Sequence, residues 1–112
     1  MPLITTTATI PAGQSLSSSI DLSDGDAEFC HMPAEWTPAL LTFQVSYDDV
    51  NFGDLVDQYT REISLNITPG TVIRVDLLPL RAGWLKFRSG SRFGAVKQTA
   101  SRTFTLIANT SK

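Results

Sequence analysis

The sequence has few of the residues from which small domains build covalent cross-links, metal sites or nucleophilic centres. It contains a single cysteine, Cys30, and a single histidine, His31. One thiol forms no intrachain disulfide, and no cysteine-based zinc site can be written. Neighbours on a strand point to opposite faces, so we expect a core thiol and an exposed imidazole instead of a catalytic dyad. We therefore expect a protein that is not an enzyme and that holds no metal or cofactor.

Long hydrophobic runs are also missing. No apolar stretch approaches the roughly 18 residues of a membrane span, and residues 1–10 contain no Lys or Arg and no apolar core of a secretory signal. The chain has 112 residues, of which 42% are hydrophobic and 18% charged, as in a packed globular domain. We expect a soluble protein made in the cytosol, with one domain over residues 1–112. Residues 1–11 and 109–112 are expected to be contact arms that order on binding a partner.

Positive charge is absent from the first half of the chain. Residues 1–60 contain nine acidic residues and no Lys or Arg, whereas residues 61–112 contain all nine basic residues and two acids. Residues 1–60 therefore carry a charge of −9, and residues 61–112 carry +7, from nine bases less two acids. The net charge of −2 conceals this asymmetry. Acidic and basic strands that alternate in space would cancel this asymmetry. Strands that separate would give a bipolar surface, suited to head-to-tail or ring-like contact with copies of the chain or with a charged partner.

Helical periodicity is missing too, and strand signals run from end to end. Alternating and β-branched segments separated by Gly, Pro, Asp and Asn clusters predict an all-β, antiparallel jelly-roll or β-sandwich of eight or nine strands. Asp48–Asn51 is expected to be a tight connection in which the Asx side chains bond their own backbone. The expected strands are 5–10, 15–22, 28–32, 40–47, 52–56, 62–67, 71–78, 84–89 and 98–108.

The acidic run from Asp21 to Glu28 places four carboxylates around Gly25. Carboxylates in a glycine-containing turn suit Ca²⁺, but the spacing departs from that of an EF-hand loop. The alternative, a solvated turn, is the interpretation that we prefer.

Basic and aromatic residues are interleaved late in the chain and could form a strip for nucleic acid. The isoelectric point near 5.1 argues against direct nucleic-acid binding and favours a basic surface that faces an acidic protein neighbour. The residues concerned are Arg81, Lys86, Arg88, Arg92, Lys97 and Arg102, with Trp84, Phe87 and Phe93.

Aromatic residues supply the remaining candidate site. The loops at the ends of a sandwich are where binding is expected, and exposed tryptophans there could stack on sugars, although most tryptophans of small β-domains pack against the core. The candidates for contact with a partner or a glycan are Trp36, Tyr47, Trp84 and Arg88.

Two longer motifs carry a resemblance to a known class of domain. The segment 43–52 (FQVSYDDVNF) looks like the hairpin of discoidin-like or galactose-binding-like jelly rolls, with Asp49-Val50 in place of the usual Asp-Gly. The segment 84–91 (WLKFRSGS) looks like their strand that ends in Arg-Ser-Gly. No sugar-contacting set of these domains carries over residue by residue.

The full order of motifs over residues 12–106 is similar to small virion proteins of tailed bacteriophages and prophages. Besides the two motifs above, it includes AGQSLSS at 12–18, MPAEWT at 32–37 and RTFTL at 102–106. This resemblance implies a structural virion protein, made in the host cytoplasm, of the head-decoration, cement or spike-base type. Its implied partners are the major capsid protein or other virion proteins and further copies of itself, without direct nucleic-acid or membrane contact. We expect a homo-oligomer, and a trimer in particular. The rival hypothesis is a carbohydrate-binding module for host recognition on a virion tail or neck.

Overall fold

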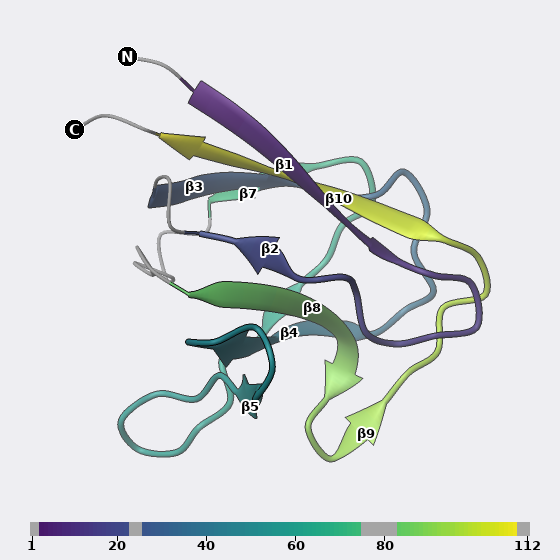
Figure 1. Ribbon diagram of the computed structural model, residues 1–112. Coiled ribbons are helices and arrows are strands. Elements are labelled where there is room, and N and C mark those ends of the chain that lie inside the picture. Colours follow the sequence, from purple (N-terminus) through teal and green to yellow (C-terminus); the bar gives the residue numbers. More distant parts are fainter. Residues whose placement is uncertain (1–2, 23–25, 75–82, 110–112) are drawn as a thin grey trace.

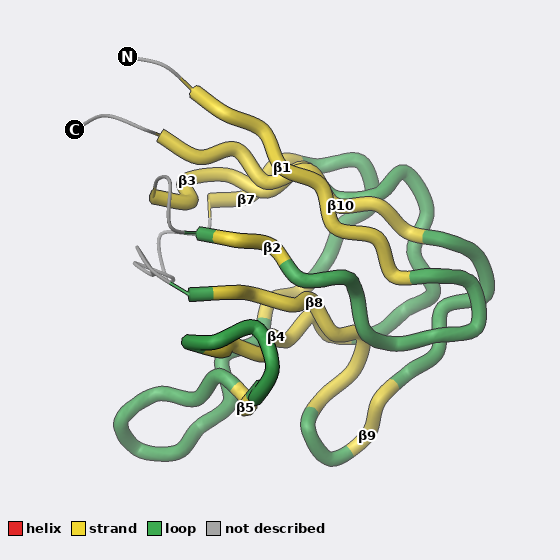
Figure 2. Tube along the Cα trace, in the orientation of Figure 1, coloured by secondary structure: helices red, strands yellow, loops and turns green. Residues whose placement is uncertain are grey.

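Two antiparallel sheets make up the fold of the chain (Figure 1). The computed structural model describes residues 3–22, 26–74 and 83–109, which form strands and loops without a helix (Figure 2). In spatial order, the first sheet contains β1 (Leu3–Ile10), β10 (Arg102–Asn109), β3 (Asp26–His31) and β7 (Val72–Arg74). The second contains β2 (Ile20–Asp21), β8 (Trp84–Ser91), β4 (Leu40–Ser46) and β5 (Gly53–Asp54). Two short strands complete it: β6 (Leu65–Asn66) on β4, and β9 (Gly94–Ala95) on β8.

The connections between the strands are those of a jelly roll. Since β5 and β6 both pair with β4, they occupy one position of the second sheet, and β9 only extends β8 as a hairpin. Eight positions remain, four in each sheet, and the chain crosses between the sheets at β1–β2, β2–β3, β3–β4, β6–β7, β7–β8 and β9–β10. Strands distant in sequence therefore lie side by side, as in double-sheet jelly rolls. The expected all-β class is confirmed.

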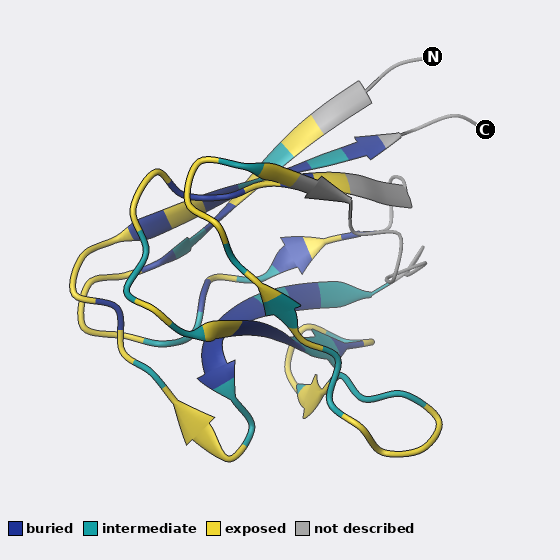
Figure 3. Cartoon of the chain, turned by 180° about the vertical axis from the view of Figure 1, so that it is seen from behind, coloured by how far each residue is buried: buried dark blue, intermediate teal, exposed yellow. Residues whose placement is uncertain are grey.

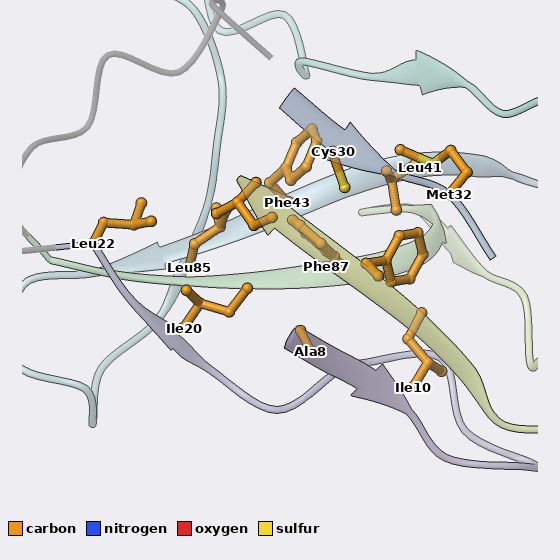
Figure 4. Close-up of a cluster of buried hydrophobic side chains, with 12 residues drawn as sticks. Ala8, Ile10, Ile20, Leu22, Cys30, Met32, Leu41, Phe43, Leu85 and Phe87 are labelled. Carbon is orange, nitrogen blue, oxygen red and sulfur yellow. The ribbon is translucent and has the colours of Figure 1, made fainter. Parts of the chain in front are cut away.

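The core lies between the sheets and is centred on a row of three aromatic rings. The ring centroid of Phe87 lies 4.7 Å from that of Phe104 in the first sheet and 5.6 Å from that of Phe43 in the second sheet. Both pairs are edge-on, with an angle of 76° between the ring planes. Edge-to-face contact is a favoured geometry for aromatic pairs. Figure 4 shows apolar side chains from facing strands, among them Phe43 and Phe87, gathered in the core. The buried cluster contains Ala8, Ile10, Ile20, Leu22, Cys30, Met32, Leu41, Phe43, Leu85, Phe87, Phe104 and Leu106.

Period-two alternation selects the core residues of the central strands. In β4, Leu41 and Phe43 are buried as expected. Tyr47, expected on the same side, follows the last residue of β4 and is 84% exposed. The strand ends at Ser46, so the alternation no longer applies one residue later.

At the start of the chain, the expected strand 5–10 is confirmed as part of β1, which pairs with β10 along its whole length, from Leu3 opposite Asn109 to Ile10 opposite Arg102. Most of the segment 1–11 expected as a contact arm therefore belongs to the first sheet, as does Asn109 of the expected arm 109–112. Ala8 and Ile10 are buried, so this segment supplies part of the core. The expected strand at 15–22 is regular only over β2. Residues 75–78 of the strand expected at 71–78, and the tail 110–112, lie outside the described residues.

Candidate interaction surface

A buried arginine fixes the chain between β5 and β6 onto the second sheet. Phe87 faces the core, so its neighbour Arg88 lies on the opposite face of the sheet. There its guanidinium donates to Thr42 Oγ1 (3.0 Å), to Asp54 Oδ1 (2.6 Å) and to the Glu62 carboxylate. Its side chain is 9% exposed. Two hydrogen-bonded carboxylates pair this buried charge, which would be costly alone, and tie residues 54–62 to β8.

The segment held by Arg88 ends in a loop closed by Asp57. Asp57 Oδ1 accepts hydrogen bonds from the backbone N–H groups of Tyr59 (2.8 Å) and Arg61 (3.0 Å). These bonds, the one from Arg61 above all, hold the pKa of Asp57 below its usual value. Thr60 takes a left-handed conformation with φ of 64°. The loop therefore has a defined shape without a partner, and Tyr59 at its tip is 66% exposed.

The turn between β8 and β9 lies beside this loop. Arg92 donates its backbone N–H to the Glu62 carboxylate (2.9 Å) and its Nη2 to the carbonyl oxygen of Thr60 (2.9 Å). Gly90 has φ of 96°, and a Cβ there would collide with the Gly94 carbonyl, so the hairpin requires glycine. Phe93 at the end of the turn is 87% exposed.

Each of the two exposed rings carries an arginine. The guanidinium of Arg61 lies 5.2 Å from the Tyr59 ring centroid, and that of Arg92 lies 4.7 Å from the Phe93 centroid. A cation–π contact therefore stabilises the position of each arginine over its ring. We call Tyr59, Arg61, Arg92 and Phe93 the basic tip. In Figure 3 the loop after β5 and the turn after β8, which carry it, are coloured partly yellow for exposed and partly teal for intermediate residues.

A second exposed loop, of opposite charge, joins β4 to β5. Asp48 Oδ1 accepts hydrogen bonds from the backbone N–H groups of Asn51 (2.8 Å) and Val50 (2.9 Å) and from Ser46 Oγ (2.8 Å). These bonds lower the pKa of Asp48 strongly and confirm the expected Asx turn. Tyr47 and Val50 are 84% and 77% exposed. We call Tyr47, Asp48, Asp49 and Val50 the acidic loop.

The charge asymmetry of the sequence is partly cancelled in space. The ion pairs Asp54–Arg88, Asp57–Arg61 and Glu35–Arg102 join acids of residues 1–60 to bases of residues 61–112. Asp48 and Asp49 form no ion pair within the described part of the chain. The two halves therefore interleave, while the acidic loop keeps its negative charge.

The four aromatic and arginine candidates from the sequence are not brought to one place. Trp36 packs edge-on against Phe104 at 5.6 Å and donates its Nε1–H to the Ala39 carbonyl oxygen, near the start of β4. Tyr47 follows the other end of β4, about 20 Å away at the rise of a strand. Trp84 pairs with Ser46 at that far end.

Arg88, the fourth candidate, lies between these two ends opposite Thr42 and is occupied by its carboxylates. The basic and aromatic residues considered as a strip are not continuous on the surface either, because Phe87, Arg88 and Arg102 are buried, while Arg81 lies outside the described residues. Tyr59 and Arg61 are absent from the sequence-based candidates. The available signal was an aromatic residue beside arginine within a turn, as in Tyr-Thr-Arg and Arg-Phe-Gly.

The cysteine and histidine lie as expected. Cys30 is 1% exposed and His31 is exposed on the other face of β3. Burial raises the pKa of the Cys30 thiol to about 12. The described residues contain no group of three or more His, Cys, Asp and Glu side chains placed to hold a metal ion. Within Asp21–Glu28, residues 23–25 lie outside the described residues.

No helix among residues 3–22, 26–74 and 83–109 could span a lipid bilayer. The chain matches no protein-family model, and comparison with curated proteins and with solved structures found no match.

Proposed function

We propose that this protein is a structural virion component, of the head-decoration, cement or spike-base type, which binds the assembled head as a homo-oligomer. The virion assignment rests on the sequence resemblance over residues 12–106. The observation that carries the binding role is the basic tip, in which each of two largely exposed aromatic rings makes a cation–π contact with an arginine. Tyrosine and arginine are enriched among the residues that dominate protein–protein binding energy.

The preorganisation of the basic tip supports this role. Asp57 closes the loop after β5, and Gly90 allows the tight turn after β8. Arg92 is held by hydrogen bonds to the Glu62 carboxylate and to the Thr60 carbonyl oxygen. Side chains that are already fixed lose less conformational entropy on association. In addition, Arg92 Nε is buried without a hydrogen-bond partner among the described residues. An unmet buried donor costs roughly 1–3 kcal/mol, which is difficult to explain by folding alone.

The acidic loop supports self-association. Its carboxylates Asp48 and Asp49 and its exposed Tyr47 and Val50 complement the charge and apolar character of the basic tip. Contact between the acidic loop of one copy and the basic tip of the next would be heterologous and would close into a ring if the rotation permits. Repetition over a head lattice would then multiply a weak single contact by avidity.

The test starts with the mass of the purified protein in solution over a salt series, by sedimentation velocity. The protein is then mixed with undecorated heads assembled from the major capsid protein of the same genome, and bound protein is measured after sedimentation. We expect stoichiometric occupancy that weakens as salt rises, because exposed charges are screened. Absence of binding at low salt overturns the head assignment.

A matched pair of double variants locates the binding surface. Y59A/F93A removes both rings of the basic tip, while F29A/V72A removes two exposed apolar side chains, 38% and 54% exposed, from the first sheet. We expect Y59A/F93A to weaken head binding at least tenfold and F29A/V72A to bind like the wild type. Equal binding by both variants contradicts the role of the basic tip. Glycan binding by the isolated chain, lost in W36A without unfolding, would favour the carbohydrate-binding rival.

A further inference from the structure

A second buried arginine, Arg102, opens β10 at the end of the sandwich opposite the acidic loop. Arg102 is 8% exposed. Its Nε donates to Gln98 Oε1 at 3.0 Å, and its Nη2 lies 3.3 Å and 3.4 Å from the Oγ1 atoms of Thr37 and Thr99. All three acceptors are neutral, so none of them neutralises the guanidinium charge.

Gln98 holds this arginine in a fixed orientation. Its amide is fully buried, and its Nε2 donates to the Thr37 carbonyl oxygen (3.0 Å) and to Ser89 Oγ (2.7 Å). Its Oε1 accepts the backbone N–H of Thr37 (2.8 Å) as well as Arg102 Nε. Because the amide is bonded on both sides, the guanidinium is anchored to the core instead of swinging freely from the surface.

The remaining edge of the guanidinium borders an open pocket. Among the described residues, the carboxylate that pairs with Arg102 Nη1 is that of Glu35, whose Oε2 lies 3.9 Å away, too far for a hydrogen bond, and the Glu35 side chain is 85% exposed. In the described part of the chain Nη1 has no hydrogen-bonded acceptor. The pocket has a volume of about 460 Å³ and is lined by Pro33, Ala34, Glu35, Ser101, Arg102 and Thr103.

Comparison with Arg88 shows that Arg102 lacks a hydrogen-bonded carboxylate among the described residues. Arg88 is equally buried, and two carboxylates lie within hydrogen-bond reach of its two terminal nitrogens. In the part of the chain that the structure describes, Arg102 has one distant and exposed carboxylate in their place. A buried charge is costly until it is paired and hydrogen-bonded, and the planar fork of arginine matches a carboxylate. We propose that the pocket at Arg102 binds a carboxylate carried by an acidic side chain of a protein partner.

The pocket lining favours an acidic side chain over a sugar acid. No aromatic ring of the described residues lines it: Trp36 faces Phe104 and borders a different pocket. That neighbouring pocket, of about 430 Å³, is lined by Trp36, Pro38, Ala39, Leu40, Asn66, Ile67 and Pro69. Segment 33–40 borders both, so a partner segment could place a carboxylate in the first and an apolar side chain in the second. This inference does not depend on a virion role, since it concerns the chemistry of one contact.

The test is an NMR titration of ¹⁵N-labelled protein at constant ionic strength. The probes are the capped tripeptide acetyl-Ala-Asp-Ala-amide, the same peptide with Asn in place of Asp, and N-acetylneuraminic acid. We expect saturable shifts of the Arg102 Nε–Hε and Ser101 amide signals with the Asp peptide, and none with the Asn peptide. Absence of a saturable shift with the Asp peptide overturns the proposal. Saturation by the sugar acid alone overturns the choice of a protein partner.

Two variants with the same change in charge separate the pocket from general electrostatics. Glu35→Gln removes the carboxylate that competes for Arg102, and we expect it to tighten Asp-peptide binding about 1.5- to 5-fold, the range of an exposed ion pair. Asp49→Asn in the acidic loop should leave binding unchanged. An equal response to both variants contradicts the proposal. Arg102→Lys, which keeps the charge but not the fork, should weaken binding at least tenfold; if it does not fold, E35Q against D49N decides.

Discussion

Arg92 Nη2 donates a hydrogen bond of 2.9 Å to the carbonyl oxygen of Thr60, a residue 32 positions earlier in the chain. This bond joins the loop after β5 to the turn after β8. Together with the bond from the Arg92 backbone N–H to Glu62, it makes one surface of two loops. The surface is therefore a product of tertiary structure, and its parts are separable by mutation.

The exposed rings of the basic tip should be dispensable for folding. In Y59A and F93A, we expect the free energy of unfolding to change by no more than about 0.5 kcal/mol, because exposed side chains contribute little to the core. Urea denaturation followed by tryptophan fluorescence measures the change. A loss of several kcal/mol in either variant would show that the ring is structural, and the head-binding result would then need another explanation.

Arg88 should be essential for stability, in contrast to the tip. In Arg88→Met, Asp54 and the mostly buried Glu62 lose their counter-charge. Breaking a buried ion pair from one side costs about 3–5 kcal/mol, and the partial exposure of Asp54 places our expectation near the lower value. The matched control is Arg61→Met, whose side chain is 74% exposed in its pair with Asp57; it should cost about 1 kcal/mol or less. Similar losses in the two variants would contradict the structural role of the Arg88 cluster.

The fold class was predictable from the sequence because alternation in β4, β8 and β10 is strong and local. Leu41 and Phe43 in β4, like Phe104 and Leu106 in β10, occupy every second position of their strands and are buried. The Asx turn at Asp48 was predictable for the same reason, since its bonds reach no further than three residues.

The candidate surface could not be predicted in the same way. Arg88 looks like one of several late basic residues, yet its environment is set by Asp54 and Glu62, 34 and 26 positions away. Two of the hydrogen bonds of Gln98 join it to Thr37, 61 positions away, and these bonds leave no local signal in the sequence. Long-range pairing across a jelly roll decides which polar residues are buried, and a single sequence contains no direct record of that pairing.

Gln98 should contribute more to the free energy of unfolding than a single side-chain amide usually does. Gln98→Ala removes the partner of both the N–H and the carbonyl oxygen of Thr37, and that of Arg102 Nε. Leaving buried polar groups unmet costs about 1–3 kcal/mol each where water does not reach them, so we expect a loss of about 3 kcal/mol. Gln58→Ala, at an exposed position, is the control and should change stability by less than about 0.5 kcal/mol. Thermal and urea unfolding give both values, and a neutral Q98A would refute the anchoring role of Gln98.

Acid should weaken the acidic loop through Asp48. The pKa of Asp48 is lowered in the folded chain by its hydrogen bonds, so the unfolded chain takes up the proton first as the pH falls. The stabilisation is therefore present above about pH 4, the ordinary range of an aspartate, and is lost below it. We expect Asp48→Asn to show a smaller loss of stability than the wild type between pH 4 and pH 2, measured by urea midpoints. Asp49→Asn, whose side chain forms no hydrogen bond among the described residues, should follow the wild type. If D48N and D49N behave alike, the Asx turn is not the source of the acid sensitivity.

Alkali should act on the core through Cys30. Burial raises the pKa of its thiol from 9.0 to about 12, so the folded chain keeps the proton when the unfolded chain has lost it. The stability linked to this group is complete below about pH 9 and declines as the pH rises from 9 towards 12. We expect the unfolding free energy of Cys30→Ala to fall less steeply than that of the wild type between pH 8 and pH 10.5, because only the wild type carries the thiol. Because the thiolate is the reactive form, alkylation of Cys30 by iodoacetamide at pH 8.5 should also be slow until urea unfolds the chain. Rapid alkylation of the native protein, or identical pH slopes in the two chains, would show that Cys30 is accessible to solvent.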